Sequence, residues 1–573
     1  MLARLLAALA ASLALALPAS AAPRDEALRL APPDFALVAV VQNFRDHSTA
    51  LLESPFAEWF PTTALGKQIL GAAPVDGLRD QLTPILAALG ITPKELFHDV
   101  LGDAVVFAYT PAPPGDPKGE RSVILVRPRK PELLEKVVGR INELQLQSKE
   151  LKALAEHKYG GAAYFERQKP DGPSDFYAFR GGVFVFSAAD AEIKAVIDRD
   201  RTAPKDKSPE LVARMTRLGV AEVAGVILIN PRALDAELAA KAKGAKLGER
   251  LMLSRLAEVW SATEMAAVYL SLDAGAELGL SVRFHAEKLP PGVKDWLVGE
   301  RTPPALWQSV PDDAMLAVAG RLKVKPLLDL LSLVNAAEGK PSVREQIAEA
   351  LGPVVGKDKL PLVLDALGPD FAAWVVPPAA GAKSALPTVV GAVKVRADGE
   401  KGASAAKALV QSLEFGFQTA RIAYNARHDD QIELREEKDG DVVIKSLAGE
   451  AFPAGFRPCF AMKGGYLLVS THPDAVKSFK APAAEPKPGG DVPLARLNAT
   501  AAREYLTANA PALAKLLAST GVGGATDEKE LTRQLGMLAK ALDLVDRAEL
   551  LVRGDANGVR LMLRVKTAKP LKR

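Results

Sequence analysis

The pattern of apolar and polar positions predicts one supersecondary unit at residues 176–197. Two short aromatic-rich runs, Phe176–Phe179 and Val183–Phe186, flank a Gly-Gly pair at 181–182. Glycine supplies the positive φ that tight hairpin turns require. Ser187–Asp190 then matches a helix capping signal, and apolar residues at helical spacing follow up to Ile197. The pattern predicts strand, turn, strand and capped helix.

The same pattern returns in the second half of the chain. Phe460–Met462 and Tyr466–Val469 flank a second Gly-Gly pair at 464–465. Ser470 and Thr471 are expected to begin a helix, with Pro473 in its first turn. This second copy predicts a hairpin and helix of the same kind.

Segments around the two copies also match in one order along the chain. The matched stretches begin at these pairs of residues: Pro32 and Val310, Leu96 and Leu362, Ser122 and Thr388, Val223 and Val492, Met265 and Arg547. Such self-similarity governs the choice of fold. We predict a tandem duplication of residues 30–287 and 309–568. The corresponding division is a signal peptide at 1–21, domains at 22–290 and 309–573, and a linker at 291–308.

Strands that come as hairpins with helices between them predict an α+β fold, with an antiparallel sheet and helices packed on one face in each half. Alternation supports this, since Val268, Leu270 and Leu272 share one side of a strand. Residues 558–565 alternate in the same way, with Leu561 and Leu563 on one side and Met562 on the other. The alternation predicts one buried face and one partly solvated face.

Turns, loops and helix ends are predicted from glycine, proline and charge. Gly102 and Gly368 are expected to be left-handed caps at helix C-termini, each preceded by an aspartate, Asp99 or Asp365. The aspartates are read as solvent-facing or paired with a nearby lysine. The Pro- and Gly-rich stretches at 110–120, 198–210, 377–387 and 481–493 are predicted to be loops.

The first residues have the features of an export signal. Arg4 precedes an apolar run, Leu5–Leu17, and Ala19-Ser20-Ala21 fits a signal peptidase site. The run is short for a membrane span, which needs about 20 residues. We therefore expect cleavage near Ala21, export to the periplasm or the cell exterior, and no transmembrane segment in the mature chain.

Composition narrows the class of protein further. Cys459 is the one cysteine, so no intramolecular disulfide can form. The net charge is +4, and basic residues are scattered among acidic ones. The densest basic stretch begins at Lys241 and lacks aromatics, which indicates a solvated helix face or loop. No nucleic-acid partner is expected, because such proteins gather basic residues on one face.

Candidate chemistry is sparse. The histidines are His47, His98, His157, His285, His428 and His472, and none has the spacing of a zinc motif. We expect them to be surface or cap residues. His428-Asp429-Asp430 is the most metal-like cluster but is expected to form an exposed turn. The sequence assigns no catalytic, cofactor-binding or metal residue and implies no cofactor.

The start of each half resembles a loose group of exported bacterial proteins of unknown function with duplicated α+β domains. The resemblance is carried by Pro33-Asp34-Phe35-Ala36-Leu37 and by Pro311-Asp312-Asp313-Ala314-Met315. The preferred hypothesis is a non-catalytic scaffold or binding protein of the bacterial envelope, with an envelope protein or an apolar ligand as partner. The alternatives are a periplasmic carrier of lipid or another apolar ligand, and a hydrolase with dispersed catalytic residues.

Overall fold

The computed structural model describes residues 23–70, 83–116, 119–203, 207–244, 247–273, 275–321, 342–356, 359–378, 385–396, 399–520 and 527–571. The predicted signal peptide, residues 1–21, lies outside them. The chain forms two compact units. Unit 1 comprises 1–50, 73–237 and 265–270, and unit 2 comprises 51–72, 238–264 and 271–573. These units group the chain differently from the predicted repeats, because strand β10 (Ala276–Phe284) belongs to unit 2.

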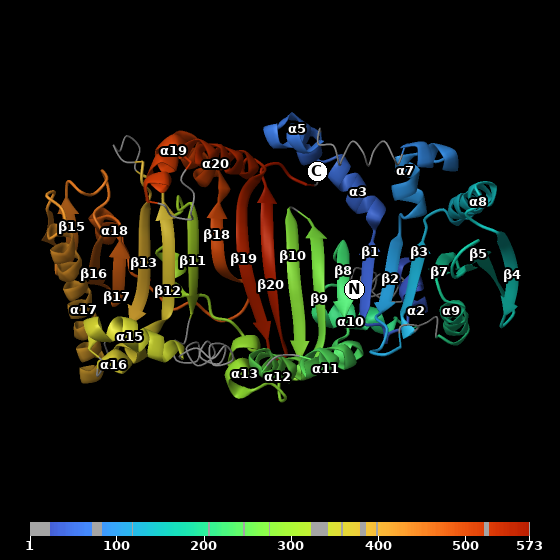
Figure 1. The fold of residues 1–573 in the computed structure, drawn as a ribbon, viewed down its shortest axis with the longest axis horizontal. Coiled ribbons are helices and arrows are strands. Elements are labelled where there is room, and N and C mark those ends of the chain that lie inside the picture. The colour runs from blue at the N-terminus through green and yellow to red at the C-terminus, as the bar shows by residue number, and fades with distance from the viewer. Residues whose placement is uncertain are drawn as a thin grey trace, which may run out of the picture. The chain divides into compact units, whose positions relative to one another are not determined.

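Unit 1 contains an antiparallel sheet whose neighbouring strands run in the order β9-β8-β1-β2-β3-β7-β6-β5-β4. Their bounds are β1 Leu37–Gln42, β2 Ala104–Thr110, β3 Arg121–Arg127, β4 Ala153–Tyr159, β5 Ala162–Gln168, β6 Asp175–Arg180, β7 Val183–Ser187, β8 Gly225–Ile229 and β9 Thr263–Leu272. The antiparallel sheet and its helices confirm the predicted α+β class (Figure 1).

Unit 2 contains an antiparallel sheet in the order β10-β20-β19-β18-β11-β12-β13-β17-β16-β15-β14. The bounds not yet given are β11 Leu316–Arg321, β12 Leu367–Val376, β13 Thr388–Val395, β14 Ile432–Asp439, β15 Val442–Gly449, β16 Cys459–Lys463, β17 Tyr466–Ser470, β18 Val492–Asn498, β19 Val545–Asp555 and β20 Gly558–Thr567.

The strand order from β9 to β4 in unit 1 is the same as that from β19 to β14 in unit 2. Local details agree as well. Asn230, after β8, accepts a hydrogen bond from the Arg232 amide, and Asn498, at the end of β18, accepts one from the Ala501 amide. Both asparagines open a helical segment in this way. The shared order is what the proposed duplication would produce, and the duplication itself stays a prediction.

The helices of unit 1 pack on both sides of its sheet. Helix α2 (Pro23–Leu30) contacts β2 and β3, and α9 (Asp190–Thr202) contacts β6 and β7. On the opposite side, α8 (Pro131–Gln147) packs Leu134 and Val137 near Val126 of β3. The remaining elements are α7 (Pro93–Glu95), η2 (Leu96–Val100), α10 (Glu210–Leu218) and η4 (Pro231–Leu234).

Unit 2 has helices at the ends of its strands as well as on its sheet. Those used below are α12 Leu247–Ala262, α13 Pro291–Leu297, η5 Ala305–Gln308, α17 Gly399–Asn425, α18 Pro473–Ser478, α19 Ala499–Thr520 and α20 Glu528–Leu542. The others within it are α4 Pro55–Trp59, η1 Phe60–Thr62, α5 Ala64–Leu70, α15 Val343–Val355 and α16 Leu360–Ala366. Helices α3 (Phe44–Leu52) and α11 (Asp235–Gly244) each have residues in both units.

Both Gly-Gly hairpins are confirmed. Gly181 and Gly182 connect β6 to β7 with φ of 55° and 82°, and Gly464 and Gly465 connect β16 to β17 with φ of 59° and 80°. A side chain is rarely accommodated at such angles, so glycine is needed here. After each hairpin the serine bonds the amide two residues on, Ser187 to Ala189 and Ser470 to His472. These serines stabilise the turn into the helix, and neither is the N-cap residue itself.

Three details of the predicted turns and loops are corrected. Gly102 and Gly368 are not left-handed caps, because neither has a positive φ. Gly368 lies within β12, which begins directly after α16 and leaves no room for a separate cap. Residues 198–202 are the last turn of α9 rather than a loop. The Asp99 carboxylate pairs with the Lys130 ammonium at 3.0 Å. This agrees with the expected pairing with a nearby lysine.

Within the described part of the chain, no helix combines the length and the apolar content required to cross a bilayer.

Candidate functional site: an open apolar sheet face

One side of the unit 2 sheet is formed by apolar residues in register across neighbouring strands. Residues directly opposite each other in an antiparallel pair project to the same face. Leu278 of β10 pairs with Leu563 of β20, which pairs with Leu550 of β19. The next row pairs Leu280 with Leu561. Rows of leucine therefore cross the first three strands of this sheet on one face.

The same face continues to β17. Leu550 pairs with Ala495 of β18, which pairs with Val318 of β11, and the row continues through Ala373 of β12 and Gly391 of β13. We call this surface the open face of unit 2, and none of its side chains is charged or forms hydrogen bonds. Its residues are Ala276, Leu278, Leu280, Val282, Leu316, Val318, Gly320, Phe371, Ala373, Val375, Val389, Gly391, Val393, Val469, Ala495, Leu497, Ala548, Leu550, Val552, Val559, Leu561, Leu563 and Val565.

The central part of the open face is accessible to solvent. Leu278 is 52% exposed, Leu563 42% and Val469 44%. Met562, between Leu561 and Leu563 on β20, points to the opposite face and is only 2% exposed. Contiguous exposed apolar surfaces of several hundred Å² mark interaction sites in proteins. The open face is therefore the strongest candidate site in the described structure.

Helices border the open face at both ends of the strands. At one end α19 packs Ala502 and Leu506 with Leu497 and Val375 of the open face. At the other end α12 and α13 pack around Val282 and Val559 (Figure 1). Beyond β17, α17 covers the sheet through Phe417, whose ring meets that of Phe460 edge-on at 5.0 Å.

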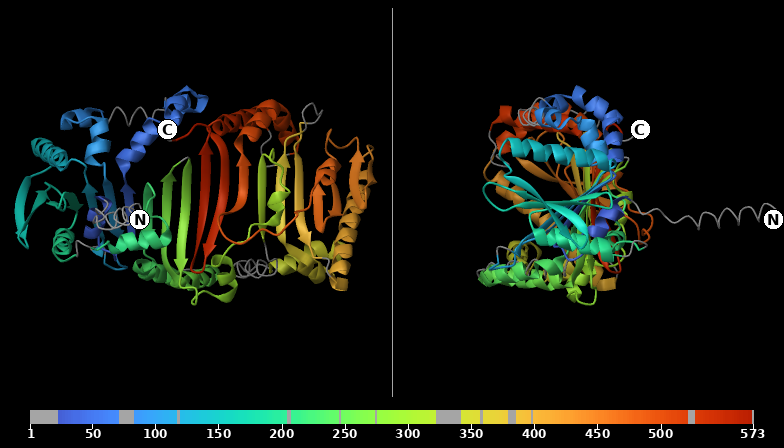
Figure 2. Two further views of the ribbon diagram at one scale, coloured as in Figure 1. Left: turned by 180° about the vertical axis from the view of Figure 1, so that it is seen from behind. Right: turned by 90° about the vertical axis from the view of Figure 1, so that its right-hand side faces the viewer.

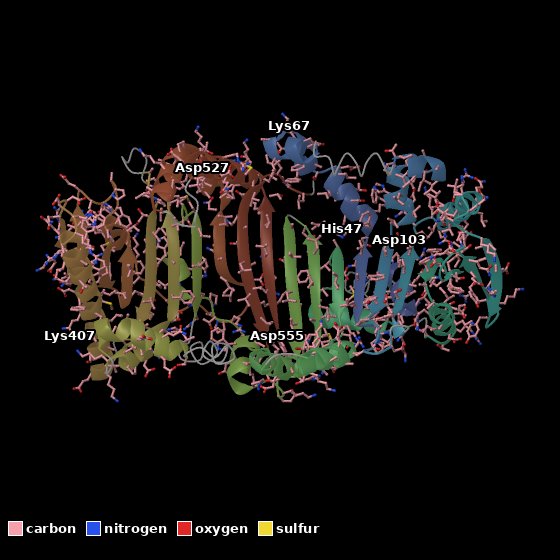
Figure 3. The ribbon with its side chains drawn as sticks, in the orientation of Figure 1. His47, Lys67, Asp103, Lys407, Asp527 and Asp555 are labelled. Atoms are coloured by element: carbon pink, nitrogen blue, oxygen red, sulfur yellow. The ribbon has the colours of Figure 1, made fainter. Side chains whose placement is uncertain are left out.

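Figure 3 marks these two strand ends with Asp527 and Asp555. Asp527 caps α20, where its carboxylate accepts hydrogen bonds from the Lys529 and Glu530 amides. Asp555 lies at the end of β19, where its carboxylate accepts from the Asn557 amide. The exposed leucines of β20 lie between these two borders. With α17 beyond β17, helices border the open face on three sides, and we call the uncovered apolar surface between them its floor.

The opposite face, which we call the packed face of unit 2, has a different chemistry. Arg496, Glu549, Arg564 and Glu277 form a row of alternating charge across β18, β19, β20 and β10. Arg496 contacts Glu549 at 3.1 Å, and Arg564 contacts Glu277 at 2.8 Å. Charged cross-strand pairs of this kind stabilise a sheet by a few tenths to about 1 kcal/mol each.

Apolar residues of the packed face are covered. Trp374, Tyr466 and Leu468 form a core with Phe479, which directly follows α18. The coil between α18 and β18 crosses this side (Figure 2), and it bonds the segment around η5, where Ser309 donates to the Lys480 carbonyl. The packed face is thus buried around β12, β13 and β17, whereas its charged row from β18 to β10 is partly exposed, and the more uniformly apolar face is open.

Unit 1 has a smaller surface of the same type. A row of directly paired residues crosses five strands, from Ile124 through Phe107, Ala39 and Ile227 to Val268. All of these except the half-buried Ala39 are exposed. The row is bordered by α8, which covers Val126, Phe179 and Phe184 on the same side. The central strands of both units therefore present an apolar face to solvent.

The histidines singled out by the sequence take part in local structure. His472 is the N-cap of α18, where its ring nitrogen accepts from the Asp474 amide at 3.3 Å. His157 bonds Glu166 at 2.9 Å, and His98 bonds Thr49 at 3.3 Å. The three remaining histidines are half-buried or exposed: His47, His285 and His428. The structure does not bring the histidines together, and the expected surface and cap roles describe them.

The two remaining candidates are also placed clearly. His428-Asp429-Asp430 lies in an exposed turn between α17 and β14, as expected, and Tyr424 stacks on His428 and bonds Asp430. Cys459 is fully buried on the packed face, and burial raises the pKa of its thiol to about 12. At neutral pH this thiol is protonated and shielded. Among the described residues, no three His, Cys, Asp or Glu side chains are arranged to hold a metal ion.

The open face itself escaped the sequence reasoning, although its signal was present. The alternation of residues 558–565 correctly separates Leu561 and Leu563 from Met562. The usual expectation is that the more apolar side is buried. Here the reverse holds, because no element of the described chain covers that side between α19 and α12. Alternation identifies which residues share a face, and it cannot identify which face is covered.

The chain matches no family model, no curated protein and no solved structure.

Proposed function

We propose that this protein is an exported, non-catalytic binding protein of the bacterial cell envelope that holds the hydrocarbon part of a lipid on the open face of unit 2. The observation that carries the proposal is the floor of exposed leucine and valine between α19 and α12, with Leu278 at 52% exposure. Leaving such residues in water is costly, at about 25 cal/mol for each Å². An apolar ligand removes that cost.

The chemistry of the floor favours hydrocarbon over a protein segment. A protein partner brings backbone N–H and C=O groups, which need hydrogen-bond partners when they are buried. The side chains of the open face offer none, since all of them are Ala, Val, Leu, Phe or Gly. A lipid chain needs no such partners, so it can be buried on this surface without an unpaired polar group.

The dimensions also suit a lipid chain. The eight strands from β10 to β17 span about 35 Å at about 4.8 Å per strand, and the strand segments between the bordering helices run for about 15–20 Å. One acyl chain occupies half of a bilayer core, or about 15 Å. A chain of that length fits between the helical walls in either direction.

A second copy of this chain is a weaker candidate for the same surface. The uncovered floor measures roughly 500–700 Å² on these dimensions, so two floors face to face would bury roughly 1,000–1,400 Å², at most the lower end of the range for stable interfaces. Stable protein interfaces bury about 1,200–2,000 Å². The α19 and α12 borders would in addition have to pass each other before two sheets could meet.

Export is the part of the proposal that rests on the sequence. The apolar run Leu5–Leu17 and the Ala19-Ser20-Ala21 site support it. Helix α2 begins at Pro23, directly after this site, and packs Ala27 and Leu28 into unit 1. Cleavage near Ala21 would leave that helix in place, so the fold is compatible with a mature chain that starts there.

The experiment measures binding of dansyl-labelled undecanoic acid by fluorescence, with the mature chain and three variants. Leu561→Glu and Leu563→Glu each place a carboxylate on the open face. Leu52→Glu is the matched control, because Leu52 is 65% exposed and lies on α3 outside the sheet. We expect saturable binding that either open-face variant weakens by at least tenfold, since burying an unpaired charge costs well over 1.4 kcal/mol. The control should stay within about twofold of the parent chain.

Two results would overturn the proposal. One is the absence of saturable binding to the parent chain. The other is equal weakening by Leu52→Glu, which would indicate a general effect of added negative charge. Native mass spectrometry of the protein purified from its own envelope adds an independent readout. Dimers that carry no lipid would identify a second copy as the occupant of the open face.

A further inference from the structure

Three helices of unit 1 meet around a pocket that is separate from the open face of unit 2 and from the exposed apolar row of unit 1. Helices α2, α9 and α10 converge on the packed side of the unit 1 sheet (Figure 1), where α2 contacts both of the others. The pocket between them has a volume of about 280 Å³. Its lining is Leu28, Arg29, Ala31, Pro33, Arg199, Ala203, Lys207, Ser208, Pro209, Glu210 and Leu211.

The walls of the pocket are held firmly. Leu28 of α2 and Leu211 of α10 are buried, and both helices pack their apolar sides inward. The Arg199 Nε donates to the Leu30 carbonyl at 2.7 Å, and the Arg214 Nη1 donates to the Pro33 carbonyl at 2.7 Å. These bonds tie α9 and α10 to the segment that follows α2. The pocket is therefore a fixed feature of the packing between the three helices.

Arg199 is a lining residue of the pocket whose hydrogen bonding is incomplete. Its Nη2 atom is buried and has no hydrogen-bond partner. Burial also lowers the pKa of this guanidinium. An unpaired buried donor on a charged group is costly, and native structures rarely keep one without a reason. An anion in the pocket, which Arg199 lines, would offset the charge of this guanidinium.

The nearby carboxylates are paired with other arginines, although Glu192 also keeps a buried oxygen, Oε2, without a hydrogen-bond partner. Arg121 pairs with Glu192 at 2.5 Å and with Asp34 at 3.0 Å. Glu210, which lines the pocket, pairs with Arg214 at 2.5 Å. Lys207 and Arg29 add positive charge to the lining. The balance of charge around the pocket is thus positive, with its acidic members bound to arginines.

We propose that this pocket binds an oxyanion, carboxylate or phosphate, carried on a short apolar group. The charged N–H groups of Arg199 and Lys207, which both line the pocket, attract the oxygens of either anion. Leu28, Ala31 and Pro33 supply an apolar wall beside it. A volume of about 280 Å³ is close to the lower end of small-ligand sites, which begin at about 300 Å³. That size suits an anion with a few carbon atoms and excludes a long acyl chain.

The site is independent of the proposed lipid function, because it lies in unit 1 and shares no residue with the open face of unit 2. The test is isothermal titration calorimetry of the mature chain with three probes: hexyl phosphate, hexanoate and inorganic phosphate. We expect hexyl phosphate to bind at a single site and more tightly than inorganic phosphate, because only the former also uses the apolar wall. Hexanoate shows whether a carboxylate can replace the phosphate.

Three variants locate the binding. Arg199→Gln removes the charge and should weaken hexyl phosphate by at least tenfold. Ala203→Phe fills the pocket while every charge is kept, and it should abolish binding even if Arg199→Gln disturbs the anchoring of α2. Arg217→Gln is the control, since Arg217 is exposed on α10 and is not part of the lining. It should leave the affinity unchanged.

The assignment would be overturned if none of the three probes gives saturable heat. It would also be overturned if Arg217→Gln weakens binding as much as Arg199→Gln, because the effect would then be general electrostatics. Binding that survives Ala203→Phe would place the probe elsewhere. The Leu561→Glu variant is tested in parallel, and its unchanged affinity for hexyl phosphate separates this site from the open face.

Discussion

The open face and the packed face of unit 2 are made by the same strands and differ in almost every physical property. On β20, Leu561 and Leu563 are exposed and Met562, between them, is buried. Beside Met562 the packed face carries charged rows such as Arg564 with Glu277. A sheet that only had to fold would cover its leucine side and expose its charged side. In this sheet Arg564 is exposed as well as Leu563, so the leucine side is left open in addition to the charged side, as the proposed lipid binding requires.

The largest expected difference between the two faces is the reactivity of a thiol placed on each. Cys459 lies on the packed face with a pKa of about 12. Val469 lies on the open face, 44% exposed. At pH 8, iodoacetamide should label a Val469→Cys, Cys459→Ala chain at least about a thousandfold faster than Cys459 in the parent, because an ordinary thiol has a pKa of about 8.5.

Two further outcomes follow from the same pair of cysteines. Lipid should slow labelling of the cysteine at 469 and leave Cys459 unchanged. Because the folded-state pKa of Cys459 is raised, its contribution to stability is present below pH about 8.5 and is lost as the pH rises toward about 12. Equal labelling rates for the two thiols would contradict the assignment of faces.

The second comparison replaces neighbouring residues of β20 by alanine. Met562→Ala removes a fully buried side chain and should lower the free energy of unfolding by about 2–5 kcal/mol. Leu563→Ala removes one that is 42% exposed and should cost only about 1–1.5 kcal/mol. Urea unfolding followed by circular dichroism measures both. A larger loss for Leu563→Ala would show that something covers the open face in solution.

The third comparison concerns a charge on the packed face of β12. Asp370 is 2% exposed, and its carboxylate lies 3.0 Å from the Arg321 Nε. Desolvation raises the pKa of Asp370 above its ordinary value, with Arg321 opposing the rise. Its contribution to stability is therefore fully present below the unfolded-state pKa, near 3.9, and is lost as the pH rises through the folded-state value.

Replacing Asp370 tests that sign. Relative to the parent, Asp370→Asn should be more stable at pH 7 than at pH 3, as measured by the urea midpoint at each pH. Asp429→Asn, in the exposed turn before β14, is the control. If Asp370→Asn is instead relatively less stable at pH 7, the ion pair with Arg321 outweighs the cost of desolvation.

The smallest effect is expected from the charged row of the packed face. Glu277→Gln removes the partner of Arg564 at 2.8 Å. Partly exposed ion pairs contribute only about 0–1 kcal/mol, and Arg564 also contacts Asp491 at 3.2 Å. We expect a loss of stability below about 1 kcal/mol, which becomes smaller still in 1 M salt. A loss comparable with that of Met562→Ala would mean that the charged row is a main source of stability.

The elements of the fold were largely accessible from the sequence because their signals are local. The Gly-Gly pairs at 181–182 and 464–465 define hairpins through backbone angles that only glycine adopts easily. The alternation at 558–565 separates Leu561 from Met562 through the two-residue period of a strand. Caps were less accessible, as Gly368 shows, since a strand can begin where a cap was expected.

The sequence by itself determined which residues share a face of a strand, where the hairpins turn and that the fold is α+β. These features depend on residues that are neighbours in the chain. Only the tertiary structure decided which face of each sheet is covered and which helices enclose a pocket. The cover over Val282 comes from α12 and α13, and Arg199 faces α2 from far along the chain. Both the open face and the oxyanion pocket depend on such distant contacts, and no local pattern specifies them.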